Sequence, residues 1–138
     1  MTTPASCVFC GILAGKLPAR MVHEDEDHIA FLPLEHINPG HIVLIPRRHT
    51  DDLFDLDASA YQRLWAVVAK LAPPLREALS AKRVGVAVEG FHVPHVHVHL
   101  VPLHAADELN PTRARAVNAA DADRLCQLIR HAFLTSRK

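Results

Sequence analysis

Runs of apolar residues predict a sheet of short strands over most of the chain. Strands are expected at residues 21–23, 29–32, 42–45, 83–89 and 95–101. The apolar run that follows His41 and ends at Pro46 is continuous, which is typical of a central strand covered on both faces. A turn around Gly90 leads into the last of these strands.

Apolar residues at helical spacing predict one long helix in the middle of the chain. Asp57 is a good N-cap for a helix over residues 58–79. Pro73 and Pro74 fall inside this helix, and because each lacks a backbone N–H we expect them to kink or interrupt it. The residues at helical spacing are Leu64, Val67, Val68, Leu71, Leu75 and Leu79.

Two further helices are predicted near the ends of the chain. A short helix covers residues 6–15, and a C-terminal helix begins at Asn118 or Asp121 and runs to about residue 135. Strands gathered around one long helix indicate an α+β domain with an antiparallel sheet. We therefore expect residues 1–138 to form a single domain of this class.

The composition limits the classes of function. The 138 residues include 15 Lys+Arg and 15 Asp+Glu, so the formal net charge is zero and nucleic acid is not an expected partner. The first residues lack the pattern of a signal peptide, and no apolar run is long enough for a membrane span. Three cysteines are too few for a secreted disulfide framework, so we expect a cytoplasmic protein without membrane contact. The acidic residues 24–27 are expected to form a solvated turn.

The run from His95 to Val101 contains three histidines in strict alternation. In a strand the three imidazoles share one face, about 6.5–7 Å apart. A core face does not normally spend three positions on a residue that titrates near pH 6.5, so this face indicates a functional site. An exposed edge strand and a simple metal chelator are the alternatives.

Cys7 and Cys10 have the spacing of a zinc knuckle. Two thiolates leave two tetrahedral positions open, and His49 and His95 are candidates for them. A redox dithiol or two buried thiols remain alternatives. Cys126 lies among apolar residues and is expected to be a core thiol.

If His95 binds a metal, His97 and His99 remain for reaction chemistry. A histidine attacks phosphorus when its free ring nitrogen is neutral and its other nitrogen is fixed by a hydrogen bond to a carbonyl. A second group must then stabilise the phosphoryl oxygens, and His99 and His41 are suitable donors. Taken alone, His41 is simply a polar residue after a turn.

Four segments of the chain resemble the histidine triad (HIT) superfamily. They are CVFCGILAGKLPA, HEDEDHIAFL, NPGHIVLIPRRH and the triad HVHVHLV, which together span about residues 7–104. The resemblance implies a compact α+β fold, usually a homodimer, with the triad strand in a central antiparallel sheet. It also implies a nucleotidyl hydrolase or transferase acting on nucleoside phosphoramidates, dinucleoside polyphosphates or related nucleotidyl conjugates.

The same resemblance implies roles for individual residues. His97 would attack the α-phosphate to form a nucleotidyl-histidine that water then cleaves. His99 would contact the phosphate and assist the leaving group, and His41 would support the triad. Bacterial-type members bind zinc through residues that match Cys7, Cys10, His49 and His95, and line the nucleoside pocket at positions that match Val8, Phe9, Ile12, Phe31 and Leu34.

The chain departs from the family pattern at two places. Pro33 stands where many members carry an aspartate that binds the ribose, and it offers neither a carboxylate nor an N–H. The loop before the triad is shortened to residues 89–94 and lacks the usual Gln-Ser or Gln-Thr pair. His92 stands near the missing hydroxyl, as a phosphate donor, a leaving-group acid or a solvent-facing side chain. Glu89 is a candidate for a ribose or amine contact.

These observations give three functional hypotheses. The first is a nucleotidyl hydrolase with a structural zinc ion. The second is a nucleotide-binding or interaction protein without significant catalysis, which the two departures favour. The third is a metalloenzyme in which His95, His97 and His99 hold a catalytic metal with an open coordination position.

Overall fold

A five-stranded antiparallel sheet forms the centre of the computed structural model, which describes residues 6–136. The strand order is β1-β2-β4-β6-β5. The strands are β1 (Arg20–Glu24), β2 (His28–Leu32), β4 (Ile42–Pro46), β5 (Arg83–Ala87) and β6 (Val98–Leu103). A second, two-stranded sheet pairs β3 (Glu35–His36) with β7 (Arg115–Ala116).

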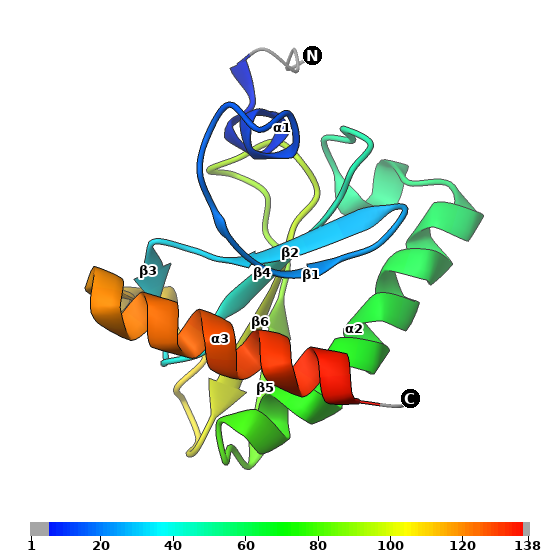
Figure 1. Ribbon diagram of the computed structural model, residues 1–138. Helices are drawn as coiled ribbons and strands as arrows, with labels where there is room; N and C mark the ends of the chain where they lie inside the picture. Colours follow the sequence, from blue (N-terminus) through cyan, green and yellow to red (C-terminus); the bar gives the residue numbers. More distant parts are fainter. Residues whose placement is uncertain (1–5, 137–138) are drawn as a thin grey trace.

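Helices cover the two faces of the large sheet unequally. The short α1 (Val8–Leu13) lies on one face, and α2 (Ala58–Ala78) and α3 (Ala119–Thr135) lie on the other (Figure 1). Short 3-10 helices η2 (Leu53–Asp55) and η3 (Pro111–Arg113) lie in the connections. The predicted α+β class, with an antiparallel sheet, one long helix and a C-terminal helix, is confirmed.

The sheet separates two hydrophobic cores, and β4 contributes to both. Ile42 and Leu44 pack under α2 and α3 in the larger core, whereas Val43 and Ile45 pack with α1 in the smaller one. All five residues of β4 are buried, as its continuous apolar sequence predicts. The alternation of side chains therefore places every second residue of the central strands on the face that carries α1.

The long helix α2 runs uninterrupted through its two prolines. Asp57 caps it as predicted, with its carboxylate accepting a hydrogen bond from the Ala60 N–H at 2.8 Å. Of the predicted kink or interruption, the interruption is wrong. Pro73 and Pro74 remove the partners of the carbonyls at residues 69 and 70, but both of those residues are exposed, so water can take the place of the missing donors.

The C-terminal helix α3 begins after Asn118, whose side chain accepts a hydrogen bond from the Asp121 N–H at 2.9 Å. Its inner face buries Cys126 and Ile129 against the larger core. The Cys126 thiol lies 3.4 Å from the Met21 carbonyl oxygen, so its assignment as a core thiol is confirmed.

Several element boundaries differ from the sequence prediction, and three of them matter most. α1 ends at Leu13 and not at residue 15, and β5 stops at Ala87, two residues early. β6 begins at Val98, so only the last triad histidine lies in the paired strand. The alternation still continues before β6, because Val96 and Val98 both enter the larger core.

The acidic run 24–27 forms an ordered connection between β1 and β2, which the expectation of a simple solvated turn missed. Asp25 accepts hydrogen bonds from the backbone N–H groups of Asp27 and His28, both at 2.8 Å, and its carboxylate lies 2.7 Å from the His23 ring. Burial raises the pKa of Asp25, but these hydrogen bonds outweigh burial and lower it to about 2.

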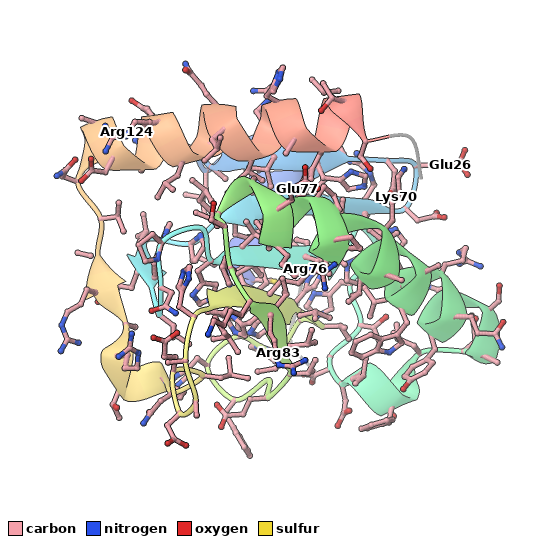
Figure 2. All side chains as sticks on the ribbon, turned by 90° about the horizontal axis from the view of Figure 1, so that it is seen from below. Glu26, Lys70, Arg76, Glu77, Arg83 and Arg124 are labelled. Carbon is pink, nitrogen blue, oxygen red and sulfur yellow. The ribbon has the colours of Figure 1, made fainter. Side chains whose placement is uncertain are left out.

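Charged side chains cover the exposed sides of α2 and α3, among them Lys70, Arg76, Glu77 and Arg124 (Figure 2). Within residues 6–136, no helix combines the length and the apolar character that crossing a bilayer requires.

Candidate functional site

The triad histidines gather on the face of the sheet that carries α1. His99 pairs with Val43 of β4, and opposite residues in antiparallel strands project to the same side. The ring centroids of His97 and His99 are 5.0 Å apart, and the ring of His97 lies 5.1 Å from that of Phe9 in α1. The structure thus brings the predicted histidines together beneath the first helix.

The hydrogen bonds of His97 fix which of its nitrogens is free. Its Nδ1 lies 2.8 Å from the carbonyl oxygen of His95. A carbonyl can only accept, so Nδ1 carries the hydrogen and Nε2 keeps its lone pair in the neutral ring. Burial lowers the pKa of His97, which favours the neutral, nucleophilic form.

His41 and His99 are joined by a hydrogen bond, and the ring of His99 lies next to that of His97. The Ile37 N–H donates to His41 Nδ1 at 3.0 Å, so the hydrogen of the neutral His41 ring sits on Nε2. That Nε2–H donates to His99 Nδ1 at 2.9 Å and leaves His99 with its own N–H at Nε2. Burial lowers the pKa of His41 to about 3 and that of His99 to about 4, with neighbouring histidines adding to the effect.

His36 extends this row of rings and was not predicted as a site residue. It is buried, and its ring centroid lies 6.0 Å from that of His41. Its Nε2 lies 3.1 Å from the carbonyl oxygen of Pro33, and its buried Nδ1 has no hydrogen-bond partner within residues 6–136. His36 lies in β3, which pairs with β7, and the sequence carries no signal of that pairing.

Cys7, Cys10, His49 and His95 form a second cluster, which we call the metal group. Their ligand atoms all lie within 4.8 Å of one another. His95 Nδ1 is 3.4 Å from Cys7 Sγ and 3.6 Å from Cys10 Sγ, and His49 Nδ1 is 3.3 Å from Cys10 Sγ. The structure therefore joins the two predicted cysteines with the two predicted histidines.

The metal group fits a tetrahedral zinc ion. Zinc bonds of about 2.0–2.3 Å place neighbouring ligand atoms roughly 3.3–3.8 Å apart, close to the distances observed. His95 Nε2 donates to the Pro46 carbonyl at 2.9 Å, which leaves the Nδ1 lone pair for a metal. Burial raises the pKa of Cys10 to about 11, and a bound cation would reverse this by favouring the thiolate.

His97 and His99 belong to no metal-binding cluster within residues 6–136. Their Nδ1 atoms are each engaged in a hydrogen bond, to a carbonyl and to His41 respectively. This arrangement argues against the hypothesis that the three triad histidines hold a catalytic metal together.

The predicted nucleoside-pocket residues divide into buried and exposed positions. Phe9 and Phe31 are buried edge to face with their centroids 5.6 Å apart, and Ile12 packs against the same core. Val8 and Leu34 are instead 48% and 84% exposed. The five residues thus form a partly packed apolar surface beside α1.

The shortened loop before the triad carries two exposed polar side chains near His97. Burial lowers the pKa of His97 and the hydrogen bond to His95 raises it, while the charge of Glu89 raises it and that of His92 lowers it. Both Glu89 and His92 are exposed, so a bound molecule can reach them.

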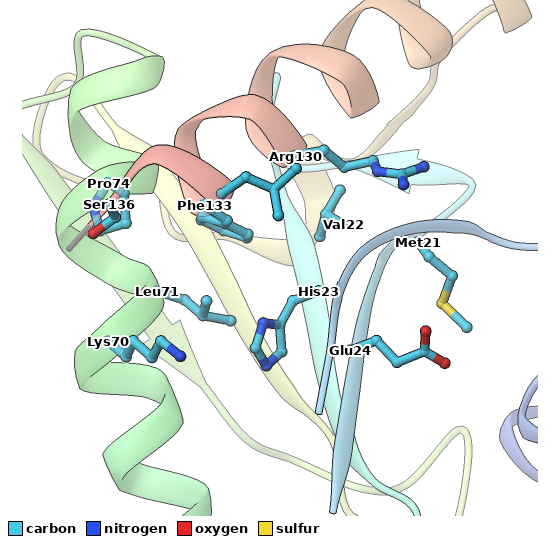
Figure 3. A pocket seen from close by; sticks show the side chains of 11 residues that line it. Met21, Val22, His23, Glu24, Lys70, Leu71, Pro74, Arg130, Phe133 and Ser136 are labelled. Atoms are coloured by element: carbon cyan, nitrogen blue, oxygen red, sulfur yellow. The ribbon is translucent and has the colours of Figure 1, made fainter. Parts of the chain in front are cut away.

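A hollow of about 390 Å³ lies away from these histidines, between β1, α2 and α3 (Figure 3). Its walls include Val22, Leu71 and Phe133 of the larger core, together with Lys70 and Arg130. It contains no residue of the triad or of the metal group. Side-chain chemistry, and not the size of a hollow, therefore identifies the candidate site.

Comparisons with known proteins agree with this geometry. The sequence profile of the HIT domain family matches residues 14–106. An uncharacterized HIT-like protein of Mycobacterium tuberculosis is 32% identical over 123 residues, which cover 86% of this chain and 85% of that protein. The bis(5′-nucleosyl)-tetraphosphatase (asymmetrical) of Schizosaccharomyces pombe is 36% identical over 83 residues, which cover 56% of this chain and 46% of that enzyme.

A solved structure extends the likeness over nearly the whole chain. The crystal structure of a zinc-bound histidine triad family protein from Mycobacterium smegmatis has a TM-score of 0.82 and 30% identity, and the match covers 96% of each chain. The domain match includes the triad, His41 and His49. This chain belongs to the HIT domain family.

Proposed function

We propose that the protein is a zinc-stabilised nucleotidyl hydrolase or transferase in which His97 is the nucleophile. The substrate is a nucleoside phosphoramidate, a dinucleoside polyphosphate or a related nucleotidyl conjugate. One observation carries this proposal: the carbonyl of His95 holds the hydrogen of His97 on Nδ1, so that Nε2 of the neutral ring keeps its lone pair. Membership of the HIT family and the partial match to a tetraphosphatase support the same chemistry.

In the first step His97 Nε2 attacks the α-phosphorus. The new N–P bond forms as the bond to the leaving group breaks, and the leaving atom takes the electron pair and a proton. His99 Nε2–H donates to a phosphoryl oxygen, and His41 holds His99 in the required tautomer. His92, on the exposed loop, supplies the proton to the leaving group.

In the second step water attacks the nucleotidyl-histidine. The P–N bond to His97 breaks, its electron pair returns to Nε2, and the proton of the water passes to His92. The products are a nucleoside monophosphate and the released leaving group, and the enzyme returns to its starting state. The nucleoside rests on Val8, Phe9, Ile12, Phe31 and Leu34.

Zinc has a structural role in this proposal. Cys7, Cys10, His49 and His95 would hold it in a closed site, with no coordination position left for water. Fixing His95 also fixes the carbonyl that orients His97. With zinc bound, Cys10 and His49 would tie α1 and the segment after β4 to the residue that orients the nucleophile.

Other parts of the proposal rest on the family resemblance and on composition. We expect a homodimer in the cytoplasm, with a nucleotide or a nucleotidyl conjugate as its small-molecule partner. We expect no stable binding to nucleic acid or to membranes.

The test is a panel of nucleotide conjugates assayed for turnover, with acid-free quenching and intact-mass analysis of the protein. Wild type should release nucleoside monophosphate and show a labile nucleotidyl adduct, and His97→Gly should show neither. Nucleotide binding in calorimetry without turnover or adduct would instead support a non-catalytic binding protein. Pro33, which replaces the ribose-binding aspartate, is the observation that favours this alternative.

A further inference from the structure

The charged surroundings of the reacting histidines are unusual for an enzyme that would cleave a polyphosphate. Within residues 6–136, the hydrogen bonds and ring contacts of His41, His97 and His99 are made with other histidines, with Phe9 and with backbone groups. No lysine or arginine is among them. Phosphoryl-transfer sites usually place cations next to the leaving phosphates, where they neutralise the negative charge that develops as the bond breaks.

The strand register explains why Glu89 lies near His97. Ala87 of β5 pairs with His99 of β6 in an antiparallel ladder. The paired residues end there, and we extend the register by two residues to infer that Glu89 lies opposite His97, on the same face of the sheet. Gly90 then turns the chain away with a φ of +90°, a conformation that suits glycine. The electrostatic effect of Glu89 on His97 agrees with this placement.

We propose that Glu89 selects the leaving group, an inference that rests on the proposed function. It would make the protein prefer nucleotide conjugates that release an amine over those that release a phosphate. The ligand class is a nucleoside 5′-phosphoramidate, above all one whose amine bears a second positive charge. Glu89 acts here as a specificity-determining residue and does not take part in bond making.

The chemistry of the two leaving groups supports this preference. When a P–N bond breaks, the proton from His92 first makes the nitrogen positively charged while it is still bound to phosphorus, and the nitrogen then leaves with the bonding electron pair as a neutral amine. A nearby carboxylate stabilises the positive charge that the nitrogen carries in the transition state. When a P–O–P bond breaks, the departing phosphate gains negative charge, which the same carboxylate repels. Glu89 is exposed and makes no hydrogen bond or ion pair within residues 6–136, so its charge remains available to the substrate.

The experiment compares three substrates that share adenosine 5′-phosphate. They are an N-alkyl phosphoramidate with a neutral chain, one with a chain ending in an ammonium group, and diadenosine tetraphosphate. Glu89→Gln should lower the ratio of kcat/KM for the ammonium substrate to that for the tetraphosphate by about tenfold, the size expected for charges a few ångströms apart at a partly exposed site. Rising salt should shrink the wild-type preference, because salt screens exposed charges.

Glu77→Gln is the matched control, because Glu77 is an exposed carboxylate of α2 on the other face of the sheet (Figure 2). It should leave the ratio unchanged. Turnover by wild type with a ratio that Glu89→Gln does not move would overturn the role of Glu89 and leave the nucleophile intact. Absence of turnover on all three substrates, without a His97 adduct, would overturn the proposed function itself, and this inference with it.

Discussion

The metal group lies next to a reaction group that consists of His41, His97 and His99. Both groups contain histidines, but the histidines have different roles in the two groups. In the metal group, His95 gives its Nε2–H to a backbone carbonyl and turns the Nδ1 lone pair toward two sulfur atoms. In the reaction group, His97 gives its Nδ1–H to a carbonyl and keeps the Nε2 lone pair free. Opposite ring nitrogens are therefore available in residues only two positions apart.

This contrast shows that the partner of one ring nitrogen decides what the other can do. His95 and His97 project toward the same side, and both are buried. What separates them is that a carbonyl of β4 binds one ring while the backbone of His95 binds the other. The two groups are also coupled, because the residue that would hold the metal supplies the carbonyl that orients the nucleophile.

The variant His97→Gly should have the largest effect, and it tests whether catalysis and zinc binding depend on separate residues. Removing the nucleophile should lower kcat/KM by at least about 10³-fold. Zinc content should stay close to wild type, since His97 contributes no ligand to the metal group. Loss of zinc from this variant, measured by elemental analysis, would mean that the two groups are not separate.

Cys7→Ser should break the metal group. Zinc binding contributes to folding, so we expect loss of the metal and a decrease in the free energy of unfolding of about 3 kcal/mol or more. Activity should fall as well, because the His95 carbonyl is no longer held. Cys126→Ala is the control. Cys126 is a core thiol in α3 and lies outside the metal group, so this variant protein should keep its zinc. Equal zinc loss in both variants would contradict the assignment.

Acid should destabilise the reaction group through His41. Burial and the charges of His99 and His36 lower its pKa to about 3 in the folded protein, against about 6.5 when unfolded. The unfolded state then binds more protons than the folded state. The contribution of neutral His41 to the free energy of unfolding is therefore complete above pH 6.5 and is lost as the pH falls toward 3. His41→Gln should remove up to about 1.4 kcal/mol per pH unit of this slope in denaturant titrations. An unchanged slope would show that His41 is not held neutral.

His36→Gln should have the smallest effect. His36 touches the row of rings but gives no hydrogen bond to His41 or His99, so kcat/KM should change by no more than about threefold. A larger loss that appears in kcat and shifts its pH profile would extend the reaction group to a fourth histidine.

The sequence predicted much of this site because its signals are local. Alternation placed the three triad histidines on one face, and the spacing of Cys7 and Cys10 indicated a metal ligand pair. The strand of residues 42–45 was predicted by its continuous apolar run. Each of these patterns needs only the geometry of one element.

The features that were missed depend on contacts between distant segments. His36 lies in β3, which pairs with β7 about eighty residues further along the chain. The continuation of α2 through Pro73 and Pro74 depends on Leu71 and Leu75, which are fully buried on the inner side of the helix. Sequence spacing alone does not report such packing, which outweighs local preference here.

The most direct test of the account locates the nucleotidyl group on the protein while counting its zinc. Wild type quenched during turnover would be digested and mapped by mass spectrometry, and zinc would be measured in the same sample. The account predicts one nucleotidyl group on His97 in protein that retains one zinc ion. An adduct on another residue, or turnover that requires a metal held by His97 or His99, would contradict it.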